Sequence, residues 1–322
     1  MSTIKTWDAI IVGGGLAGLS AAIYLGRAQR DTLVIDSGKS MARWEPEVQN
    51  YLGFPKGISG PELLQRGREQ AEQYGVRFIK DEVITAGGRE GAFRLRGRKK
   101  SHVAKSLLIA TGIYHIPPSI NGVRACLGHS MFFCKDCDGV RVRGKQIAIY
   151  GAGNETAEYA LGMLLHSSRI AIVTDGRAPQ WDKAHARWIR EYQIPVFPEA
   201  IARAQHRGCQ IQFLKFANGT KLPVEALFTT RGDIYFNKLA KMLGAKIAGG
   251  EVVVNESQRT TVKGLYAAGC VTPANCQMII AAGQGATAAQ AINRDLFKKS
   301  LATHSLPGFR ARPPGHRGPT ML

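Results

Sequence analysis

The sequence lacks the features of membrane-spanning, secreted and zinc-binding proteins. Its 322 residues contain no apolar run of about 18 residues, the length that a membrane-spanning helix requires. The apolar residues 9–12 lead into glycines, as a buried strand would, and not into a signal-peptide cleavage site. Six cysteines are too few for a disulfide scaffold, and no second CxxC or CxxH completes a zinc site. We therefore expect a cytoplasmic protein without a metal centre.

Acidic residues are also scarce, since 24 Asp and Glu residues stand against 43 Lys and Arg residues, for a net charge of +19. A basic surface keeps a protein soluble and suits an acidic redox protein or an anionic membrane surface as a partner. No zinc-finger, helix-turn-helix or RNA-binding signature is present, so nucleic acid is the least favoured partner. A peripheral membrane location remains an alternative to the free cytoplasm.

Glycine, in contrast, is abundant, and its clearest cluster is the turn at residues 13–18. The turn follows an apolar run and precedes a helical pattern, after which a second apolar run ends at an acid. In such a βαβ unit the glycines allow a tight turn, the approach of a pyrophosphate and close helix packing, while the acid accepts hydrogen bonds from a ribose. The residues predicted to bind this first dinucleotide are Gly13, Gly15, Gly18 and Asp36.

A second unit of the same kind begins at residue 145. A threonine takes the third glycine position, and the strand at residues 170–174 ends at Asp175. An acid there suits a ribose 2′-hydroxyl and repels a 2′-phosphate, and Arg177 is the neighbour that could offset this repulsion. The residues predicted to bind a second nucleotide are Gly151, Gly153, Asn154, Glu155, Thr156 and Asp175.

A CxxC pair followed by an acid lies between the two turns, at Cys134, Cys137 and Asp138. The thiolate is the reactive form of cysteine, and Lys135 or a helix N-terminus would favour it. The pattern therefore predicts a working redox pair that exchanges electrons with a bound nucleotide cofactor. The alternative is two buried small side chains without reactivity.

The rest of the chain alternates apolar strands with helical patterns, which is typical of an α/β fold. Pro117 and Pro118 predict a domain boundary. After residue 301 the composition shifts to Pro, Gly, Arg and His, which predicts a disordered basic tail. Further helices are expected over residues 60–74 and 277–291, and further strands over residues 76–79, 93–96, 107–110, 226–230 and 264–269.

The motifs GGGLAG, NYLGFPKGISGPEL, LLIATG, CKDCDG, GAGNETAEYA and GLYAAGCV occur in the order seen in low-molecular-weight thioredoxin reductases, which the chain resembles over residues 7–297. The resemblance implies two Rossmann-like three-layer nucleotide-binding domains, the second inserted into an FAD domain made of both chain ends. It also implies a homodimer, and a reorientation that moves the dithiol between the flavin and an outside substrate. The implied parts are residues 1–118 and 249–302 for FAD, 119–248 for the inserted domain, and 303–322 for the tail.

The resemblance also assigns roles to single residues. Cys137 is expected to face the flavin, Cys134 to exchange with the substrate disulfide, and Asp138 to act as general acid and base. The expected FAD-binding residues are Gly13, Gly15, Gly18, Asp36, Asn50, Val83, Thr111, Gly112, Gly269, Cys270, Gln277 and Met278.

Three departures from the family pattern change the expected electron donor. Residues 174–176 replace the His-Arg-Arg cluster that holds the NADPH 2′-phosphate, so NADPH is expected to be a poor ligand. Cys270 replaces an aspartate that bonds the ribityl chain, and a thiol is a weak substitute. Cys276 replaces an arginine. For Cys270 and Cys276 we expect two inert thiols in the core.

These departures resemble the pyridine-nucleotide-independent branch of the family, above all the diflavin-linked disulfide oxidoreductases. We therefore expect a flavoenzyme that exchanges electrons between Cys134/Cys137 and FAD without NADPH, with a second FAD as an option. Its substrate would be a thioredoxin-like protein or a small thiol. The alternatives are an NADH- or ferredoxin-dependent thioredoxin reductase, a dithiol oxidase that uses oxygen, and a redox sensor without enzymatic activity.

Overall fold

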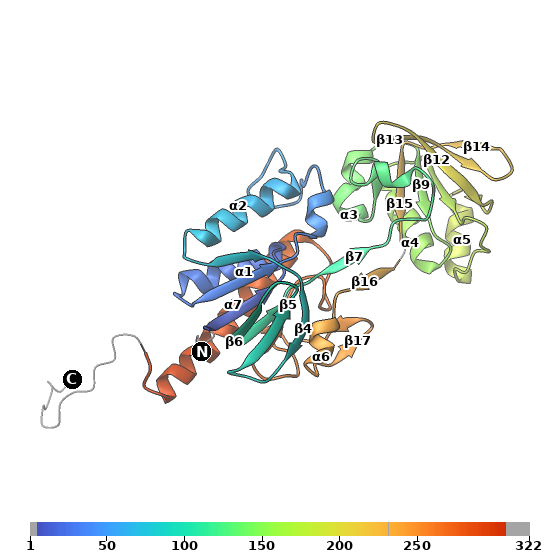
Figure 1. Cartoon of the computed structure of the whole chain (residues 1–322). Helices are drawn as coiled ribbons and strands as arrows, with labels where there is room; N and C mark the ends of the chain where they lie inside the picture. Colours follow the sequence, from blue (N-terminus) through green and yellow to red (C-terminus); the bar gives the residue numbers. More distant parts are fainter. Residues whose placement is uncertain (1–4, 231, 307–322) are drawn as a thin grey trace, which may run out of the picture.

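The computed structural model of the chain describes residues 5–230 and 232–306, which form two lobes (Figure 1). The first lobe is built on a seven-stranded sheet in the order β3-β2-β1-β6-β5-β4, with β19 also paired to β6. β3, β2, β1, β6 and β19 pair in parallel, and β4 and β5 pair antiparallel. The strands are β1 (Thr6–Val12), β2 (Thr32–Asp36), β3 (Arg77–Lys80), β4 (Val83–Gly87), β5 (Phe93–Gly97), β6 (Ser101–Ile109) and β19 (Leu265–Ala267).

The central strands are apolar on both faces because layers cover both sides of the sheet. Ile11 and Leu108 pack against helices on one face, and Ile10 and Leu107 pack on the opposite face against Phe93 of β5 and the core around α6. A Cβ on Gly285 would lie 2.0 Å from the carbonyl oxygen of Ala17, so glycine allows the close contact of α7 with α1. The helices are α1 (Leu16–Arg27), α2 (Gly60–Glu72), α6 (Lys238–Met242) and α7 (Met278–Ala302).

The second lobe contains a five-stranded parallel sheet in the order β11-β10-β9-β15-β8. Ile147 and Ile149 pack with the helices on one face, while Ala148 and Tyr150 pack against an antiparallel sheet on the other. The elements are β8 (Met131–Phe132), α3 (Lys135–Asp138), β9 (Ile147–Tyr150), α4 (Asn154–Met163), β10 (Ile170–Val173), α5 (Lys183–Glu191), β11 (Val196–Phe197), β12 (Ile201–Arg207), β13 (Gln210–Phe216), β14 (Lys221–Pro223) and β15 (Ala226–Thr229).

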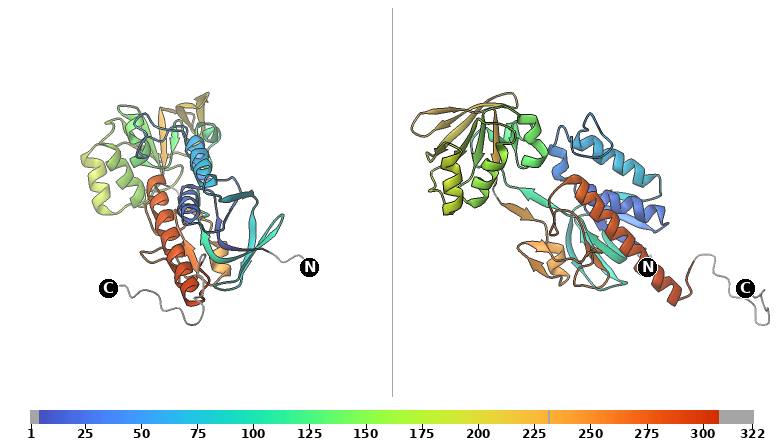
Figure 2. Two further views of the ribbon diagram at one scale, coloured as in Figure 1. Left: turned by 90° about the vertical axis from the view of Figure 1, so that its left-hand side faces the viewer. Right: turned by 180° about the vertical axis from the view of Figure 1, so that it is seen from behind.

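Two short antiparallel strands, β7 (Ile113–His115) and β16 (Asp233–Tyr235), join the lobes, and the first and last described elements, β1 and α7, both belong to the first lobe (Figures 1 and 2). Leu239 and Ala240 of α6 already pack in the core of the first lobe, before the expected boundary at residue 249. The remaining elements are the 3-10 helices η1 (Met41–Trp44), η2 (Val123–Cys126) and η3 (Gly139–Val142), with strands β17 (Ile247–Ala248) and β18 (Glu251–Val252).

The parallel sheets with their covering layers confirm the predicted α/β fold class of Rossmann-like units. The last helix is longer than expected, because Leu296 packs in the core and Asp295 pairs with Arg259. The predicted disordered tail lies, from residue 307 onward, outside the described residues. Among the described helices, none has the length and apolar character needed to cross a bilayer.

Candidate functional site

A cavity of about 390 Å³ lies at the carboxyl ends of β1 and β6 and extends to the CxxC segment of the second lobe. Its floor is the first glycine-rich turn. Gly13 has φ +112°, and a Cβ there would lie 2.2 Å from the carbonyl oxygen of Ala110, so the turn requires glycine. The carboxylate of Asp36 accepts a hydrogen bond of 3.1 Å from the backbone N–H of Gly14. The N-terminus of α1 and Asp36 thus face the cavity, an arrangement that fits the pyrophosphate and ribose of FAD.

Most of the residues predicted to bind FAD line this one cavity. Gly18 and Gly269 lie just behind the wall, where Gly18 packs against the carbonyl of Gly13 and the N–H of Gly269 donates to Gln284. The predicted residues in the wall itself are Gly13, Gly15, Asp36, Asn50, Val83, Thr111, Gly112, Cys270, Gln277 and Met278.

Cys134 and Cys137 form a disulfide whose two cysteines line the same cavity. Both are half-buried at the start of α3, where Sγ of Cys134 accepts a hydrogen bond of 3.1 Å from the backbone N–H of Cys137. A donor at this position stabilises a thiolate on Cys134. Lys135 contributes less than the sequence predicts, because its ammonium pairs with Asp136 at 2.8 Å.

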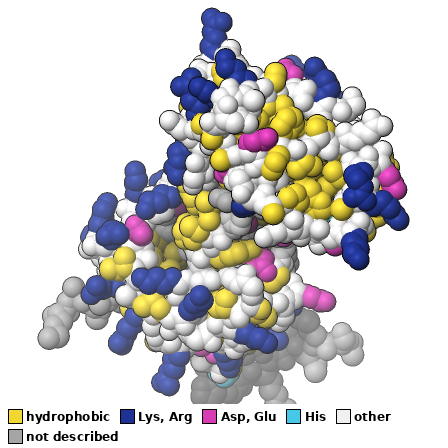
Figure 3. Space-filling view, turned by 90° about the vertical axis from the view of Figure 1, so that its right-hand side faces the viewer, with side chains coloured by type: hydrophobic (Ala, Val, Ile, Leu, Met, Phe, Trp, Pro, Cys, Tyr) yellow, Lys and Arg dark blue, Asp and Glu magenta, His cyan; other side chains and the backbone are white. Residues whose placement is uncertain are grey.

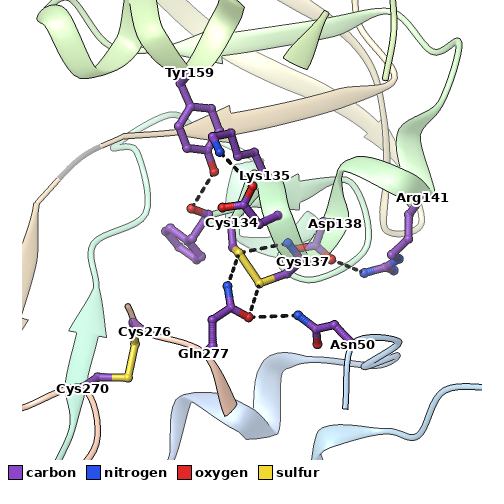
Figure 4. Close-up of a disulfide and its surroundings, with 12 residues drawn as sticks. Asn50, Cys134, Lys135, Cys137, Asp138, Arg141, Tyr159, Cys270, Cys276 and Gln277 are labelled. Atoms are coloured by element: carbon purple, nitrogen blue, oxygen red, sulfur yellow. Dashed lines mark hydrogen bonds and ion pairs between the residues drawn. A yellow bond between two sulfur atoms is a disulfide. The ribbon is translucent and has the colours of Figure 1, made fainter. Parts of the chain in front are cut away.

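Gln277 connects the disulfide to the first lobe (Figure 4). Its Nε2 donates to Sγ of Cys134 at 3.3 Å, and its Oε1 lies 3.4 Å from Sγ of Cys137. Nδ2 of Asn50 donates to the same Oε1 at 2.9 Å, which fixes the orientation of the amide. Two residues predicted as cofactor ligands therefore also hold the redox pair in place.

Asp138 lies buried beside the disulfide and is paired with Arg141 at 2.7 Å. Burial raises the pKa of Asp138, and the Arg141 guanidinium opposes the shift. A second acid, Glu45, lines the cavity just after η1, and its pKa is raised to about 7 by burial and by Asp138, against Arg141 and His115. The site therefore holds two carboxyl groups whose pKa values are raised by burial, as suits proton transfer.

Cys270 and Cys276 correct the prediction from the sequence. They are not inert thiols in the core: they form a second disulfide in the loop between β19 and α7, where Cys276 is exposed. Both line the same cavity as the first pair.

The second glycine-rich turn is occupied by contacts within the chain. Asp175, predicted to bind a ribose, accepts hydrogen bonds from the Tyr150 hydroxyl at 2.7 Å and from the backbone N–H of Ile201 at 2.8 Å. Asn154, at the start of α4, makes two hydrogen bonds with Asp182. Its Oδ1 accepts from the backbone N–H of Asp182 at 2.6 Å, and its Nδ2 donates to the Asp182 carboxylate at 3.2 Å. Asp175 and Asn154, two of the residues predicted to bind a second nucleotide, are therefore engaged in bonds within the chain.

The other residues predicted for this second site each have different contacts. The hydroxyl oxygen of Thr156 lies 2.9 Å from the hydroxyl oxygen of Thr230. A Cβ atom on Gly151 would lie 2.0 Å from the same Thr156 oxygen, so this position requires glycine. Gly153 has open space where a Cβ would lie. Glu155 lines a smaller cavity formed by the second lobe and the connecting strands, together with His115 and Lys135. Arg177 does not face outward, because its guanidinium lies over the Tyr150 ring and its Nε donates to the carbonyl of Thr174.

Sequence reasoning missed Glu45 and Arg141 as parts of the site. The spacing of Asp138 and Arg141, three residues apart, was a usable signal because such residues face each other on a helical turn. Glu45 gave no comparable signal, since only folding brings η1 beside α3. The described residues contain no cluster of three or more His, Cys, Asp or Glu that could hold a metal ion.

Lys and Arg side chains are scattered over both lobes on the face shown in Figure 3, and apolar side chains lie exposed on the second lobe. The distribution on this face is that of a generally basic surface.

The chain is similar to known oxidoreductases over most of its length. The family model of the pyridine nucleotide-disulphide oxidoreductases matches residues 7–292. The chain is 30% identical over 294 residues to the thioredoxin reductase of Treponema pallidum, covering 88% of this chain and 95% of that protein. It is similar to the crystal structure of HlmI, with a TM-score of 0.87 and 25% identity over 93% of this chain and 95% of that one. An oxidoreductase from Agrobacterium tumefaciens has a TM-score of 0.83 and 26% identity over 91% and 99% of the two chains.

Proposed function

Because the chain belongs to the pyridine nucleotide-disulphide oxidoreductase family and is a flavin-dependent disulfide oxidoreductase of the thioredoxin reductase type, we propose that it works without NADPH. Cys134 and Cys137 exchange two electrons with FAD, which supplies the electron acceptor when bound. The observation that carries the proposal is the set of contacts around Asp175. A carboxylate held there by Tyr150 and Ile201 repels the 2′-phosphate of NADPH.

The chemistry follows from the residues of the site. A thiolate of a dithiol substrate attacks Sγ of Cys134, and Cys137 leaves as a thiolate on the cavity side, close to Asp138. The second substrate thiol closes the substrate disulfide and releases Cys134. The two electrons are then held by Cys134 and Cys137, and Asp138 takes up or gives a proton. A thioredoxin-like protein or a small dithiol fits this exchange.

The disulfide must leave the cavity to meet a protein substrate. The paired strands β7 and β16 are the connection about which the second lobe would turn. A homodimer, as the resemblance implies, is part of the proposal and is tested by the molar mass in solution from light scattering.

A second FAD is the other candidate at the second turn, favoured by the α4 N-terminus and by an acid in place of the family's arginines. The bonds from Asn154 to Asp182 must open before a pyrophosphate reaches that N-terminus. The flavin absorbance of protein purified without added cofactor shows whether the chain binds one FAD or two. One flavin per chain means that Asp182 keeps the turn closed, and two mean that FAD displaces it.

The test of NADPH independence is a coupled assay. NADPH is added to the holoenzyme with oxidised thioredoxin, and nicotinamide oxidation and thiol release are followed together. We expect neither, whereas rapid coupled turnover would refute the proposal. Bleaching of the flavin by NADH, turnover with reduced ferredoxin, or peroxide formation after dithiol addition would identify the alternative donors and acceptors. Absence of turnover in the wild-type protein with every donor and acceptor, together with partner binding by Cys134→Ser, would identify a redox sensor.

A further inference from the structure

The loop between β19 and α7 carries a disulfide that the proposed function does not use. Cys270 and Cys276 are bonded to each other and line the same cavity as Cys134 and Cys137. Figure 4 shows the second pair to one side of Gln277, the residue that follows Cys276 and contacts both sulfurs of the first pair. The four sulfurs thus belong to one cavity.

The surroundings of the Cys270–Cys276 bond suit a disulfide that exchanges with thiols better than one that stabilises the fold. Cys276 is exposed together with residues 273–275, which leaves this part of the loop open to an outside thiol. It immediately precedes the N-cap of α7, a helix of 25 residues, and a helix N-terminus favours a thiolate. The two cysteines are six residues apart, and a disulfide that closes so short a loop restricts the unfolded chain little.

We propose that Cys270–Cys276 is a second redox-active disulfide, which an external dithiol opens at Cys276. One thiolate of the dithiol attacks Sγ of Cys276, and Cys270 leaves as a thiolate that takes a proton from water. The second thiol of the same molecule then attacks the mixed disulfide, releasing Cys276 and closing the external disulfide. Two electrons pass from the dithiol to the chain, and the reverse exchange with an external disulfide restores the bond. This inference does not depend on whether NADPH binds.

Counting thiols separates this pair from the others. The chain has two free cysteines, buried Cys126 and exposed Cys209, and two disulfides. The holoenzyme of Cys134→Ser/Cys137→Ser keeps the second pair alone, and Cys270→Ser/Cys276→Ser keeps the first pair alone. Each is equilibrated without oxygen in mixtures of reduced and oxidised dithiothreitol, then acid-quenched, denatured and alkylated. Mass spectrometry counts the labelled thiols.

We expect both variants to change from two labelled thiols to four, with midpoints within tenfold of each other in the ratio of reduced to oxidised reagent. A structural disulfide would leave Cys134→Ser/Cys137→Ser at two thiols under mixtures that bring the other variant to four, and this result would overturn the proposal. Four thiols before any reductant would also overturn it, because the bond would then be absent. If either variant fails to fold, differential alkylation of the wild-type holoenzyme with peptide mapping gives the same two midpoints.

Discussion

The guanidinium of Arg141 donates to the carboxylate of Asp138 across 2.7 Å, inside the wall of the disulfide cavity. Burial raises the pKa of Asp138 above its usual value, and the arginine opposes this shift. The pair thus sets when the acid that follows Cys137 gives or takes its proton. Removing the arginine would leave a buried carboxyl group without a partner, which favours the neutral form.

Replacing Asp138 with Asn removes the proton carrier while keeping the shape of the side chain. We expect dithiol-driven reduction of the flavin to slow by about 100-fold or more, the usual contribution of a positioned acid or base. Stopped-flow absorbance measures the rate. The matched control is Asp136→Asn on the same short helix, whose exposed carboxylate pairs with Lys135. Equal slowing in both variants would remove Asp138 from the mechanism.

Glu45 predicts a pH-dependent stability. Its pKa rises from 4.5 to about 7 on folding, so the folded chain retains a proton that the unfolded chain loses between these values. Its contribution to the free energy of unfolding therefore falls as pH rises through that window. We expect Glu45→Gln to gain stability over the wild type between pH 5 and 8, and the exposed Glu47→Gln serves as the matched control. Urea unfolding at both pH values measures the difference, and parallel curves would contradict it.

The two glycine-rich turns offer a paired test of the FAD site. A Cβ on Gly15 meets nothing closer than 3.5 Å, and one on Gly153 meets nothing within 4 Å, so both alanine variants should fold. Gly15→Ala places a methyl group where the pyrophosphate approaches, and we expect FAD affinity to fall roughly tenfold or more. Gly153→Ala should keep its flavin. Flavin absorbance after dialysis measures both. Full retention in Gly15→Ala would contradict this placement of the cofactor.

The amide of Gln277 is predicted to support the thiolate of Cys134. Gln277→Ala removes a hydrogen bond to that sulfur, a loss of about 1 kcal/mol or roughly fivefold in rate. Asn50→Ala removes only the contact that orients the amide, so its effect should have the same direction and be smaller. The readout is the rate of dithiol exchange at pH 7. An unchanged rate in Gln277→Ala would show that the contact carries no energy.

Local patterns in the sequence were sufficient to predict the parts of the site that are formed by contiguous residues. The turn at Gly13, the CxxC pair and the acid after it are contiguous, and the structure brings their residues to one cavity. The assignment of roles to these residues stays a prediction, as do the domain boundaries.

Contacts between distant segments could not be predicted in this way. Glu45 reaches Asp138 only because η1 folds beside α3, and no spacing in the sequence records that contact. Asp182 is hydrogen-bonded to Asn154, 28 positions away in the sequence, so the sequence did not predict that Asp182 occupies the second turn. The pairing of Cys270 with Cys276 was the opposite case. Their spacing was visible, but only the exposed loop geometry distinguishes a disulfide from two core thiols.

The central claim is that electrons pass between the Cys134–Cys137 pair and FAD while NADPH is excluded. The most direct measurement is anaerobic stopped-flow absorbance of the holoenzyme, mixed separately with dithiothreitol and with NADPH. We expect the dithiol to bleach the flavin, the bleaching to be lost in Cys137→Ser, and NADPH to leave the spectrum unchanged. Rapid bleaching by NADPH, or bleaching by the dithiol at the wild-type rate in Cys137→Ser, would contradict the account.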